Sequence, residues 1–474
     1  MTLRHVLMPG HPCIRAAQSL LFAMLSILMM LHSDSVARGI WDGAQLELIT
    51  TDPKGVFIPG QPGLDKGIAL DTQGRVYVVY SRSRFPQWDS LFFAYKDPGQ
   101  LWSPEVPLPV TMRFAHAGVA VTPGDNVAQF VFLDGGYYED TYIVHGVYDL
   151  ALSSWTLDTV ALTTRNLWDR AGFSFDLDSL GGVHVAWYEP MWNAELGIIV
   201  DRQMYAENTT GIWRAQVVAD IGYGGSVTAE PDGRVHITYS VRRDNHNLSV
   251  FAANRSRGDT AWVADSLDTA PATYSAYSLQ LGQDGSSHVL FGGADCYSCI
   301  SYRLFYTWRP PGEMAWAPWR QIFDTSGGGL LRLDCTGRAH ILHSWYHPEA
   351  WGATKFYATN ESGTWINQRI SFGGLSEVKG IPLMPSYVID RYQRAHAVLV
   401  AGPGADDFEL YYYAAPTVLF DVFDVVKVID YVYLTEQGTC DPLIYDADCN
   451  EEVDVADLMA LINYVFRGGP RGCR

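Results

Sequence analysis

Apolar and polar positions alternate along most of the chain in a phrase that recurs. Each copy is an apolar strand of period two, a polar turn that usually contains glycine, and a second apolar strand. Corresponding positions lie about 50 to 56 residues apart, which indicates an array of similar β units. The seven copies begin at Gly67, Gly118, Phe173, Ser226, Ser278, Leu330 and Ser386.

A second phrase follows each of the first six copies. It is a short aromatic strand, a polar turn and a strand that opens with tryptophan, as in "MYAENTTGIWRAQVV" from residue 204. Each unit therefore holds four strands, A to D, joined by hairpin-like turns. Seven such units predict a mainly β fold, a seven-bladed β-propeller over residues 38–416. The tryptophans are Trp102, Trp155, Trp213, Trp262, Trp319 and Trp365.

The seventh unit lacks the tryptophan strand, because Pro416 follows its third strand directly. The letters "GIW" at residues 39–41 repeat the "GIW" at residues 211–213, where a fourth strand opens. We therefore expect residues 40–49 to supply the fourth strand of the last blade. Such closure would remove a free sheet edge and tie down the start of the mature chain.

Histidine recurs at the start of the second strand in five copies. A ring of histidines can bind a metal, but neighbours in this pattern belong to different blades. We expect these histidines to be structural, bonded to the turn or to the backbone of an adjacent blade. The repeated tryptophans are expected to pack between the sheets. The five histidines are His184, His236, His288, His340 and His396.

The composition fits a large exported β protein. Hydrophobic residues make up 48% of the 474 residues, so disorder is not expected. The formal net charge of −19 argues against a nucleic-acid partner, which would need a basic surface.

The first residues have the pattern of a secretory signal peptide. Arg4 and Arg15 precede an apolar run at residues 20–31, and "SVA" at residues 35–37 is a small-x-small cleavage site. We expect residues 1–37 to be removed and the protein to be secreted or attached to the cell surface. The alternative is an uncleaved anchor, although the run is short for one. No membrane span is expected in the mature chain.

Seven cysteines are present, and Cys13 would leave with the signal peptide. Outside the cytoplasm disulfides are allowed. The "CYSC" at residues 296–299 predicts a local disulfide or two free thiols rather than half of a zinc site, since no second CxxC exists.

The predicted ligand site lies on one face of the propeller. The B–C and D–A connections share this face, called here the B–C face, and the A–B and C–D turns share the opposite A–B face. The A–B turns are short and alike, which predicts a structural role, whereas the B–C loops vary, and variable loops on a rigid scaffold often carry function. Aromatic rings there could stack on sugars beside charged groups such as Glu189, or they could only cover the rim. The candidates are Trp88, Tyr138, Trp192, Arg242, Arg243, Tyr346 and Trp351.

An enzymatic alternative rests on a resemblance to sialidases and other glycan-active propellers. The turn "TNESGTW" at residues 359–365 is similar to the sialidase Asp-box SxDxGxxW but is one residue short. The resemblance would imply three arginines around a carboxylate, a tyrosine nucleophile and a paired glutamate. The spacing singles out no such set, and GxSxG, HExxH and P-loop motifs do not occur in the sequence.

After Pro416 the apolar period changes from two to helical. Residues 424–433 and 457–466 align at an offset of 33 and carry matching apolar stripes, which predicts two helices. Before the second helix, "DADCNEEVDVAD" has the spacing of a calcium loop, with Glu451 where glycine usually makes the turn. The expected Ca²⁺ ligands are Asp446, Asp448, Asn450, the carbonyl of Glu452, Asp454 and Asp457.

This tail, residues 417–474, resembles the dockerin family, a duplicated loop–helix module. The resemblance implies calcium-dependent binding to a cohesin-like or cell-surface protein. In the first unit only Asp421 and Asp424 stand at ligand positions, so we expect one Ca²⁺ site. The tail could instead pack on its own propeller. If its two helices run antiparallel, Cys440 and Cys449 could be bonded.

These observations predict a secreted, propeller-based recognition protein for a glycan or protein ligand, with a calcium-dependent attachment tail. The alternative is a secreted glycoside hydrolase carried by the same tail.

Overall fold

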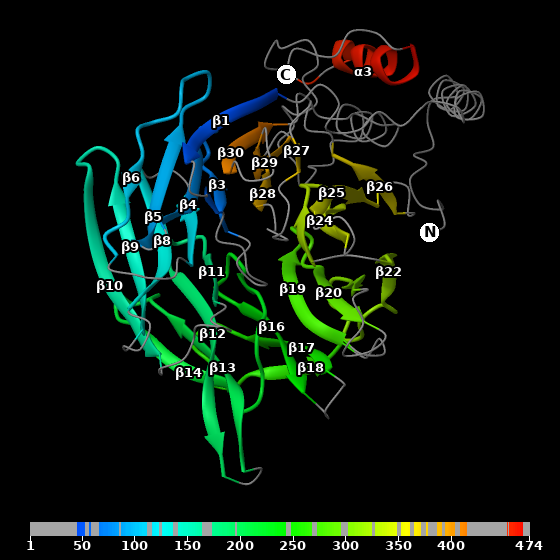
Figure 1. The fold of residues 1–474 in the computed structure, drawn as a ribbon. Coiled ribbons are helices and arrows are strands. Elements are labelled where there is room, and N and C mark those ends of the chain that lie inside the picture. Colours follow the sequence, from blue (N-terminus) through cyan, green and yellow to red (C-terminus); the bar gives the residue numbers. More distant parts are fainter. Residues whose placement is uncertain are drawn as a thin grey trace. The chain divides into compact units, whose positions relative to one another are not determined.

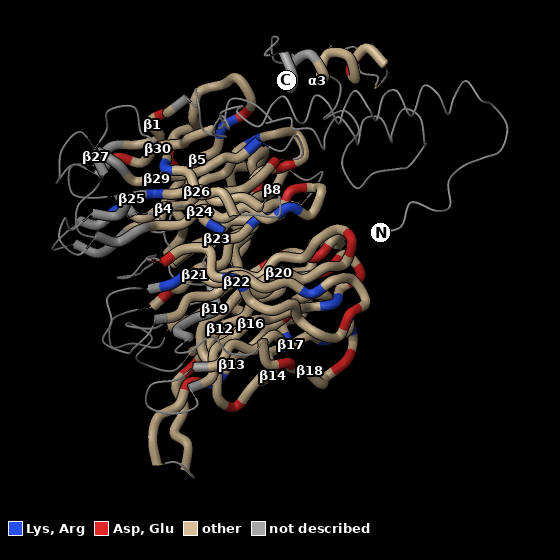
Figure 2. The backbone as a smooth tube through the Cα atoms, turned by 90° about the vertical axis from the view of Figure 1, so that its right-hand side faces the viewer, with Lys and Arg blue, Asp and Glu red and all other residues tan. Residues whose placement is uncertain are grey.

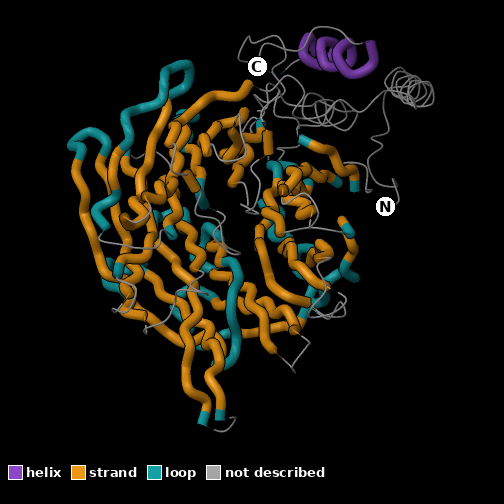
Figure 3. Tube along the Cα trace, viewed as in Figure 1, coloured by secondary structure: helices purple, strands orange, loops and turns teal. Residues whose placement is uncertain are grey.

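The computed structural model describes one large all-β unit and one C-terminal helix. Residue contacts divide the chain into a unit over Gly43–Pro416 and a second unit formed by the two chain ends. Strands dominate the described part of the chain, and its one helix is α3 (Val455–Arg467) (Figure 3). The residues described are 45–52, 56–57, 66–84, 87–110, 116–122, 126–135, 141–163, 173–194, 197–242, 248–267, 273–294, 302–324, 328–347, 352–360, 365–370, 376–377, 386–390, 394–402, 408–414, 453 and 455–467.

The unit over Gly43–Pro416 is a seven-bladed β-propeller, as predicted. Its antiparallel four-stranded sheets follow one another around a ring (Figure 1). Blades 4 and 5 are joined by one residue pair, Leu248 with Thr273, into a continuous sheet. Two short additional strands, β2 and β27, pair with the second strands of blades 1 and 7.

The strands of blades 1 to 3 follow in chain order. They are β2 (Val56–Phe57), β3 (Ile68–Leu70), β4 (Val76–Arg84), β5 (Gln87–Lys96), β6 (Val106–Pro107), β7 (Ala117–Val121), β8 (Val127–Asp134), β9 (Thr141–Asp149), β10 (Ser154–Thr163), β11 (Phe173–Leu177), β12 (Val183–Asn193), β13 (Ile198–Glu207) and β14 (Arg214–Ala219).

Blades 4 to 7 continue the pattern, and the last takes its outer strand from the N-terminal side of the chain. Their strands are β15 (Val227–Ala229), β16 (Val235–Arg242), β17 (Leu248–Arg255), β18 (Val263–Ser266), β19 (Thr273–Leu281), β20 (Ser287–Ala294), β21 (Tyr302–Arg309), β22 (Arg320–Phe323), β23 (Gly328–Leu333), β24 (Ala339–His347), β25 (Gly352–Thr359), β26 (Ile366–Arg369), β27 (Ser376–Glu377), β28 (Ser386–Ile389), β29 (Ala395–Gly402), β30 (Phe408–Ala414) and β1 (Gln45–Asp52).

Strand β1 closes the ring, which confirms the prediction for the seventh blade. It pairs antiparallel with β30, from Gln45 opposite Ala414 to Asp52 opposite Phe408. The expected strand covered residues 40–49, whereas the described strand begins at Gln45 and extends to Asp52. The outer edge of β30 is thereby hydrogen-bonded along its whole length.

In three of the described A–B turns one aspartate side chain organises the turn. In blade 1 the Asp71 carboxylate accepts hydrogen bonds from the backbone N–H groups of Gln73 and Arg75, both at 2.9 Å. Gly74 closes the turn with φ at +80°, a conformation that favours glycine. Asp178 and Asp334 organise the turns of blades 3 and 6 in the same way.

The core lies between adjacent blades, and the repeated tryptophans pack into it. Trp155 of blade 2 meets Phe93 of blade 1 edge-on with ring centroids 5.7 Å apart, and Trp262 of blade 4 meets Tyr205 of blade 3 at 5.2 Å. Blade 5 differs from the prediction. There Trp316 packs on the core between blades 4 and 5, and Trp319 contacts Phe305 of its own blade.

Helix α3 agrees with the helix predicted at residues 457–466. Leu458 and Leu461 are buried, as the apolar stripe predicts. The other predicted helix, at residues 424–433, lies outside the described residues. Within the described part of the chain, no helix has the length and apolar character needed to span a membrane.

One cysteine of the propeller is oxidised. Cys335, in the A–B turn of blade 6, is disulfide-bonded. Its partner must be one of the remaining cysteines, all of which lie outside the described residues. The alternatives for "CYSC" and for Cys440 with Cys449 therefore stay predictions.

Candidate functional site

The B–C connection of blade 3 is a long hairpin that projects from the ring (Figure 1). Strands β12 and β13 have 11 and 10 residues and stay paired from His184 opposite Glu207 to Asn193 opposite Ile198. Gly197, with φ at +63°, donates its N–H to the carbonyl of Asn193 at 2.9 Å. The hairpin therefore continues as a two-stranded ribbon beyond the four-stranded blade.

One face of this hairpin carries an apolar strip with two aromatic rings, called here the aromatic strip, formed by Tyr188, Pro190 and Trp192. Alternate residues of a strand share a face, so these three side chains lie on the same side. Trp192 is 62% exposed, and its cross-strand partner Ile199 is 68% exposed. Exposed apolar groups side by side at the end of a ribbon are typical of a contact surface.

The strip continues toward blade 4. The ring of Tyr188 meets that of Tyr223 edge-on at a centroid distance of 6.4 Å. Tyr223 lies in the D–A connection and forms a β-bridge with Ser240 of β16. Strand β16 ends at Arg242, two residues beyond this bridge. Two predicted site positions, Trp192 and Arg242, therefore lie on the B–C side of adjacent blades.

The opposite face of the hairpin holds a charged pair. Glu189 stands opposite Arg202 across the two strands. Burial raises the pKa of Glu189 above its ordinary value, and the charge of Arg202 opposes the rise. Arg202 is also 3.9 Å from Asp220 and contacts the sulfur of Met191. A raised pKa means that this carboxyl holds its proton to a higher pH than a free glutamate does.

The other predicted ligand residues are placed only in part. Trp88 lies in β5 of blade 1, and Tyr346 lies in β24 of blade 6. At these two positions and at Arg242, the structure describes the backbone but not the side chain. Tyr138, Arg243 and Trp351 lie outside the described residues. Of the seven candidates, the side chain of Trp192 alone is described.

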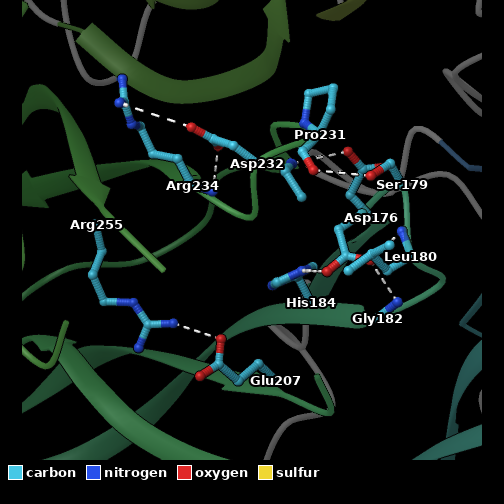
Figure 4. Close-up of polar contacts among 12 residues, drawn as sticks. Asp176, Ser179, Leu180, Gly182, His184, Glu207, Pro231, Asp232, Arg234 and Arg255 are labelled. Carbon is cyan, nitrogen blue, oxygen red and sulfur yellow. Dashed lines mark hydrogen bonds and ion pairs between the residues drawn. The ribbon is translucent and has the colours of Figure 1, made fainter. Parts of the chain in front are cut away.

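Buried acid–histidine–tyrosine clusters occupy the A–B side of the blades. In blade 3, Nε2 of His184 is 3.5 Å from Asp178, and Nδ1 bonds the hydroxyl of Tyr205 at 2.6 Å. Tyr205 donates to Glu207 at 3.0 Å. Arg255 of blade 4 pairs with Glu207 at 2.6 Å, as Figure 4 shows. Burial lowers the pKa of His184, so its ring is neutral at pH 7.

The histidines are therefore structural, but their partners differ in part from the prediction. Turn carboxylates do bond His236 (to Glu230, 2.6 Å) and His396 (to Asp390, 3.1 Å). In four of the five histidines, all but His236, Nδ1 bonds a tyrosine hydroxyl of the same blade instead of neighbouring backbone. The His–Tyr pairs of blades 5, 6 and 7 are His288–Tyr306, His340–Tyr357 and His396–Tyr412.

A cavity of about 670 Å³ opens on the A–B face between blades 1 and 7. It is called here the seam cavity, because β1 closes the ring at this place. Its walls include Glu47 of β1, Lys96 of β5 and Arg394 of blade 7. In the side view, charged residues gather at turns along one side of the propeller (Figure 2). The sequence predicted this face to be purely structural and gave no signal for the cavity.

The predicted calcium loop is represented by one ligand. Asp457 lies in the first turn of α3 and is fully buried. Asp446, Asp448, Asn450, Glu452 and Asp454 lie outside the described residues. A buried carboxylate at the start of a helix fits position 12 of a calcium loop, and the site stays a prediction.

Comparisons with known proteins identify the fold. No protein-family profile matches the sequence, and no curated protein does either. An ulvan lyase solved with a GlcA(1-4)Rha3S saccharide has 10% identity over 77% of this chain and 95% of that chain, with a TM-score of 0.50. The polysaccharide lyase Uly1 has 12% identity over 75% and 90%, with a TM-score of 0.49.

A mutant of the NanB sialidase from Streptococcus pneumoniae is a more distant neighbour. It has 9% identity over 81% of this chain and 72% of that chain, with a TM-score of 0.39. At these identities the likeness to the ulvan lyase shows the propeller fold alone, since folds of this kind host unrelated functions.

Proposed function

We propose that this chain is an exported glycan-binding propeller whose B–C face holds the glycan and whose tail attaches it through a calcium-dependent module. The aromatic strip on the β12–β13 hairpin is the observation that carries this proposal. Flat rings bind the apolar C–H faces of sugars by dispersion and by release of water. A propeller that holds a saccharide, in the ulvan lyase structure, is consistent with a ligand of this class.

The exposure of Trp192 makes it the anchor of the strip. A ring that is 62% exposed has much apolar area still to bury, and truncating such an anchor costs about 2 kcal/mol or more of binding energy. Tyr188 is buried and Pro190 half-buried, so they would support rather than lead the contact.

A glycan array probed with the mature chain tests this proposal. We expect Trp192→Ala to weaken binding to the array hits at least tenfold. Leu180→Ala is the matched control, because Leu180 is 71% exposed on the A–B turn of the same blade. Equal binding by the wild type and Trp192→Ala would show that the strip is not part of the binding site. An array without hits would refute the glycan proposal.

A second candidate function is glycoside cleavage on the same face, and the raised pKa of Glu189 favours it. A protonated Glu189, on the face of the hairpin opposite the strip, would act as the general acid for the leaving oxygen of a sugar bound on that face. Each array hit should therefore be incubated with the wild type and with Glu189→Gln. If the wild type cleaves a hit, and Glu189→Gln still binds it but no longer cleaves it, the protein is a glycoside-cleaving enzyme and not only a binding protein.

The oxidised state of Cys335 supports export, since structural disulfides persist in oxidising compartments. The signal-peptide pattern at residues 1–37 points the same way. Sequencing the N-terminus of protein recovered outside the cytoplasm tests this part of the proposal, with Arg38 as the expected first residue.

The tail is proposed to bind one Ca²⁺ and to dock a cohesin-like or cell-surface protein. Calorimetric titration of the mature chain should give one calcium per chain, lost in Asp446→Ala. Asp421→Ala is the matched control, because Asp421 belongs to the first unit, which lacks the remaining ligand side chains. A stoichiometry of two, or unchanged binding in Asp446→Ala, would contradict the single-site proposal.

A further inference from the structure

The seam cavity is built from parts of the chain that only ring closure brings together. Thr72 and its turn come from blade 1, Arg394 comes from the A–B turn of blade 7, and Glu47 comes from β1. Its volume of about 670 Å³ lies in the range of small-ligand sites, about 300–1,000 Å³. The strip on the B–C face contributes nothing to this cavity.

Three ion pairs compensate part of the charge of the cavity wall. Lys96 bonds Glu47, and Nε of Arg394 donates to Asp390 at 2.7 Å. Asp97 of the lining pairs at 2.5 Å with Arg75, which is not part of the lining. Four carboxylates, those of Glu47, Asp71, Asp97 and Asp390, line the cavity against two cations, Lys96 and Arg394. An anionic ligand would therefore meet more negative than positive charge.

The Lys96–Glu47 pair leaves hydrogen-bonding capacity that suits hydroxyl groups. An ionised carboxylate has about four acceptor sites and an ammonium group has three donors. The Lys96–Glu47 pair uses Oε2 of Glu47, and both side chains keep solvent access, at 14% and 37%. A hydroxyl can donate to the carboxylate and accept from the ammonium group at once, which no purely anionic or cationic group can do.

Apolar side chains complete the wall. Leu70, Val76 and Val121 line the cavity beside the charged pairs. An alternation of apolar surface with fixed donors and acceptors matches a sugar ring, which presents C–H faces and hydroxyl edges. From this combination, we infer that the seam cavity binds an uncharged oligosaccharide, at a site separate from the B–C face.

This inference stands whether or not the aromatic strip binds a glycan. It predicts a second site on the opposite face, so a chain with both sites could bridge two strands of one polymer. Two linked sites raise the effective affinity for a polymer without new contacts.

The test blocks the mouth of the cavity from an exposed turn. Thr72 lines the cavity and is exposed, so Thr72→Trp fills the entrance without entering the core. Gln283→Trp is the matched control, because Gln283 is exposed at the equivalent turn position of blade 5. Equal melting temperatures of the two variants and the wild type would show that the fold is kept.

Calorimetry with cellotetraose, mannotetraose and maltotetraose measures the site, with tetragalacturonate as the anionic comparison. We expect at least one neutral tetrasaccharide to bind the wild type, Thr72→Trp to weaken it tenfold or more, and Gln283→Trp to stay within twofold. Trp192→Ala should leave this binding unchanged. The inference is overturned if no neutral tetrasaccharide binds, if tetragalacturonate binds as well, or if Thr72→Trp has no effect.

The two proposals fail in different ways. If binding is lost in Trp192→Ala but kept in Thr72→Trp, the strip is the binding site and the seam-cavity inference is wrong. The reverse pattern would keep the seam cavity and remove the strip.

Discussion

At the scale of single residues, the propeller keeps polar side chains buried by pairing them with one another. His288 shows this: Nε2 bonds the hydroxyl of Ser286 at 2.8 Å and Nδ1 bonds that of Tyr306 at 2.6 Å. Asp284 in turn accepts from Ser286 at 2.6 Å. Buried polar groups are costly only when they lack partners, so these clusters are compatible with a stable core.

The same burial should make the protein sensitive to acid. Burial lowers the pKa of His288 to about 4, against the opposing charge of Asp284. The unfolded chain, with an ordinary histidine pKa near 6.5, therefore takes up the proton first as the pH falls. The contribution of His288 to stability is present above pH 6.5 and is lost as the pH falls toward 4.

We expect the free energy of unfolding to fall by up to about 1.4 kcal/mol per pH unit for this histidine across that window. Urea unfolding at several pH values between 7 and 4 measures the slope. His288→Asn should be less stable at pH 7 but should show a shallower decline. Parallel pH profiles for the two proteins would contradict the assignment.

At the scale of elements, the sequence predicts the repeat well and the exceptions poorly. The strand pattern located all four strands of each blade, because alternation reports which face of a strand is buried. The sequence did not predict that Trp316, rather than Trp319, packs on the core between blades 4 and 5. Both tryptophans lie in the same turn, so only the packing of the folded chain distinguishes them. The sequence also missed the His–Tyr bonds, because His184 lies directly opposite Glu207 and reaches Tyr205 diagonally.

Strand β1 is the element on which the ring depends. A chain that begins after Asp52 would leave the edge of β30 unpaired, and exposed strand edges promote aggregation. We expect this truncation to lose the cooperative melting transition or to aggregate in size-exclusion chromatography. A chain that begins at Gln45 is the control, since it keeps β1. If both truncations melt like the mature protein, closure by β1 does not support the fold.

At the scale of the whole molecule, the sites could be predicted only in part. The sequence placed Trp192 on a variable loop, and the structure adds that the loop is a paired ribbon with Ile199 beside the indole. The seam cavity could not be predicted from the sequence, because Glu47 and Arg394 are hundreds of positions apart and neither belongs to a recognisable motif. Only the closed ring places them in one wall.

The disulfide of Cys335 offers a test of the whole fold in its expected environment. Removing a structural disulfide typically costs about 2–4 kcal/mol of stability, so Cys335→Ser should lower the free energy of unfolding by that amount. Adding a reductant should lower the free energy of unfolding of the wild type to that of the variant or below it. A variant that unfolds like the wild type without reductant would show that this bond does not hold the native state together.

Closure by β1 also has a consequence for the order of synthesis. The first strand to leave the ribosome pairs with the last strand of the propeller, β30, so the ring cannot close until almost the whole domain has been made. Contacts of such large sequence separation form slowly. If the chain is exported as proposed, it would thus remain open long enough to be threaded through a membrane pore and would become a ring only on the far side.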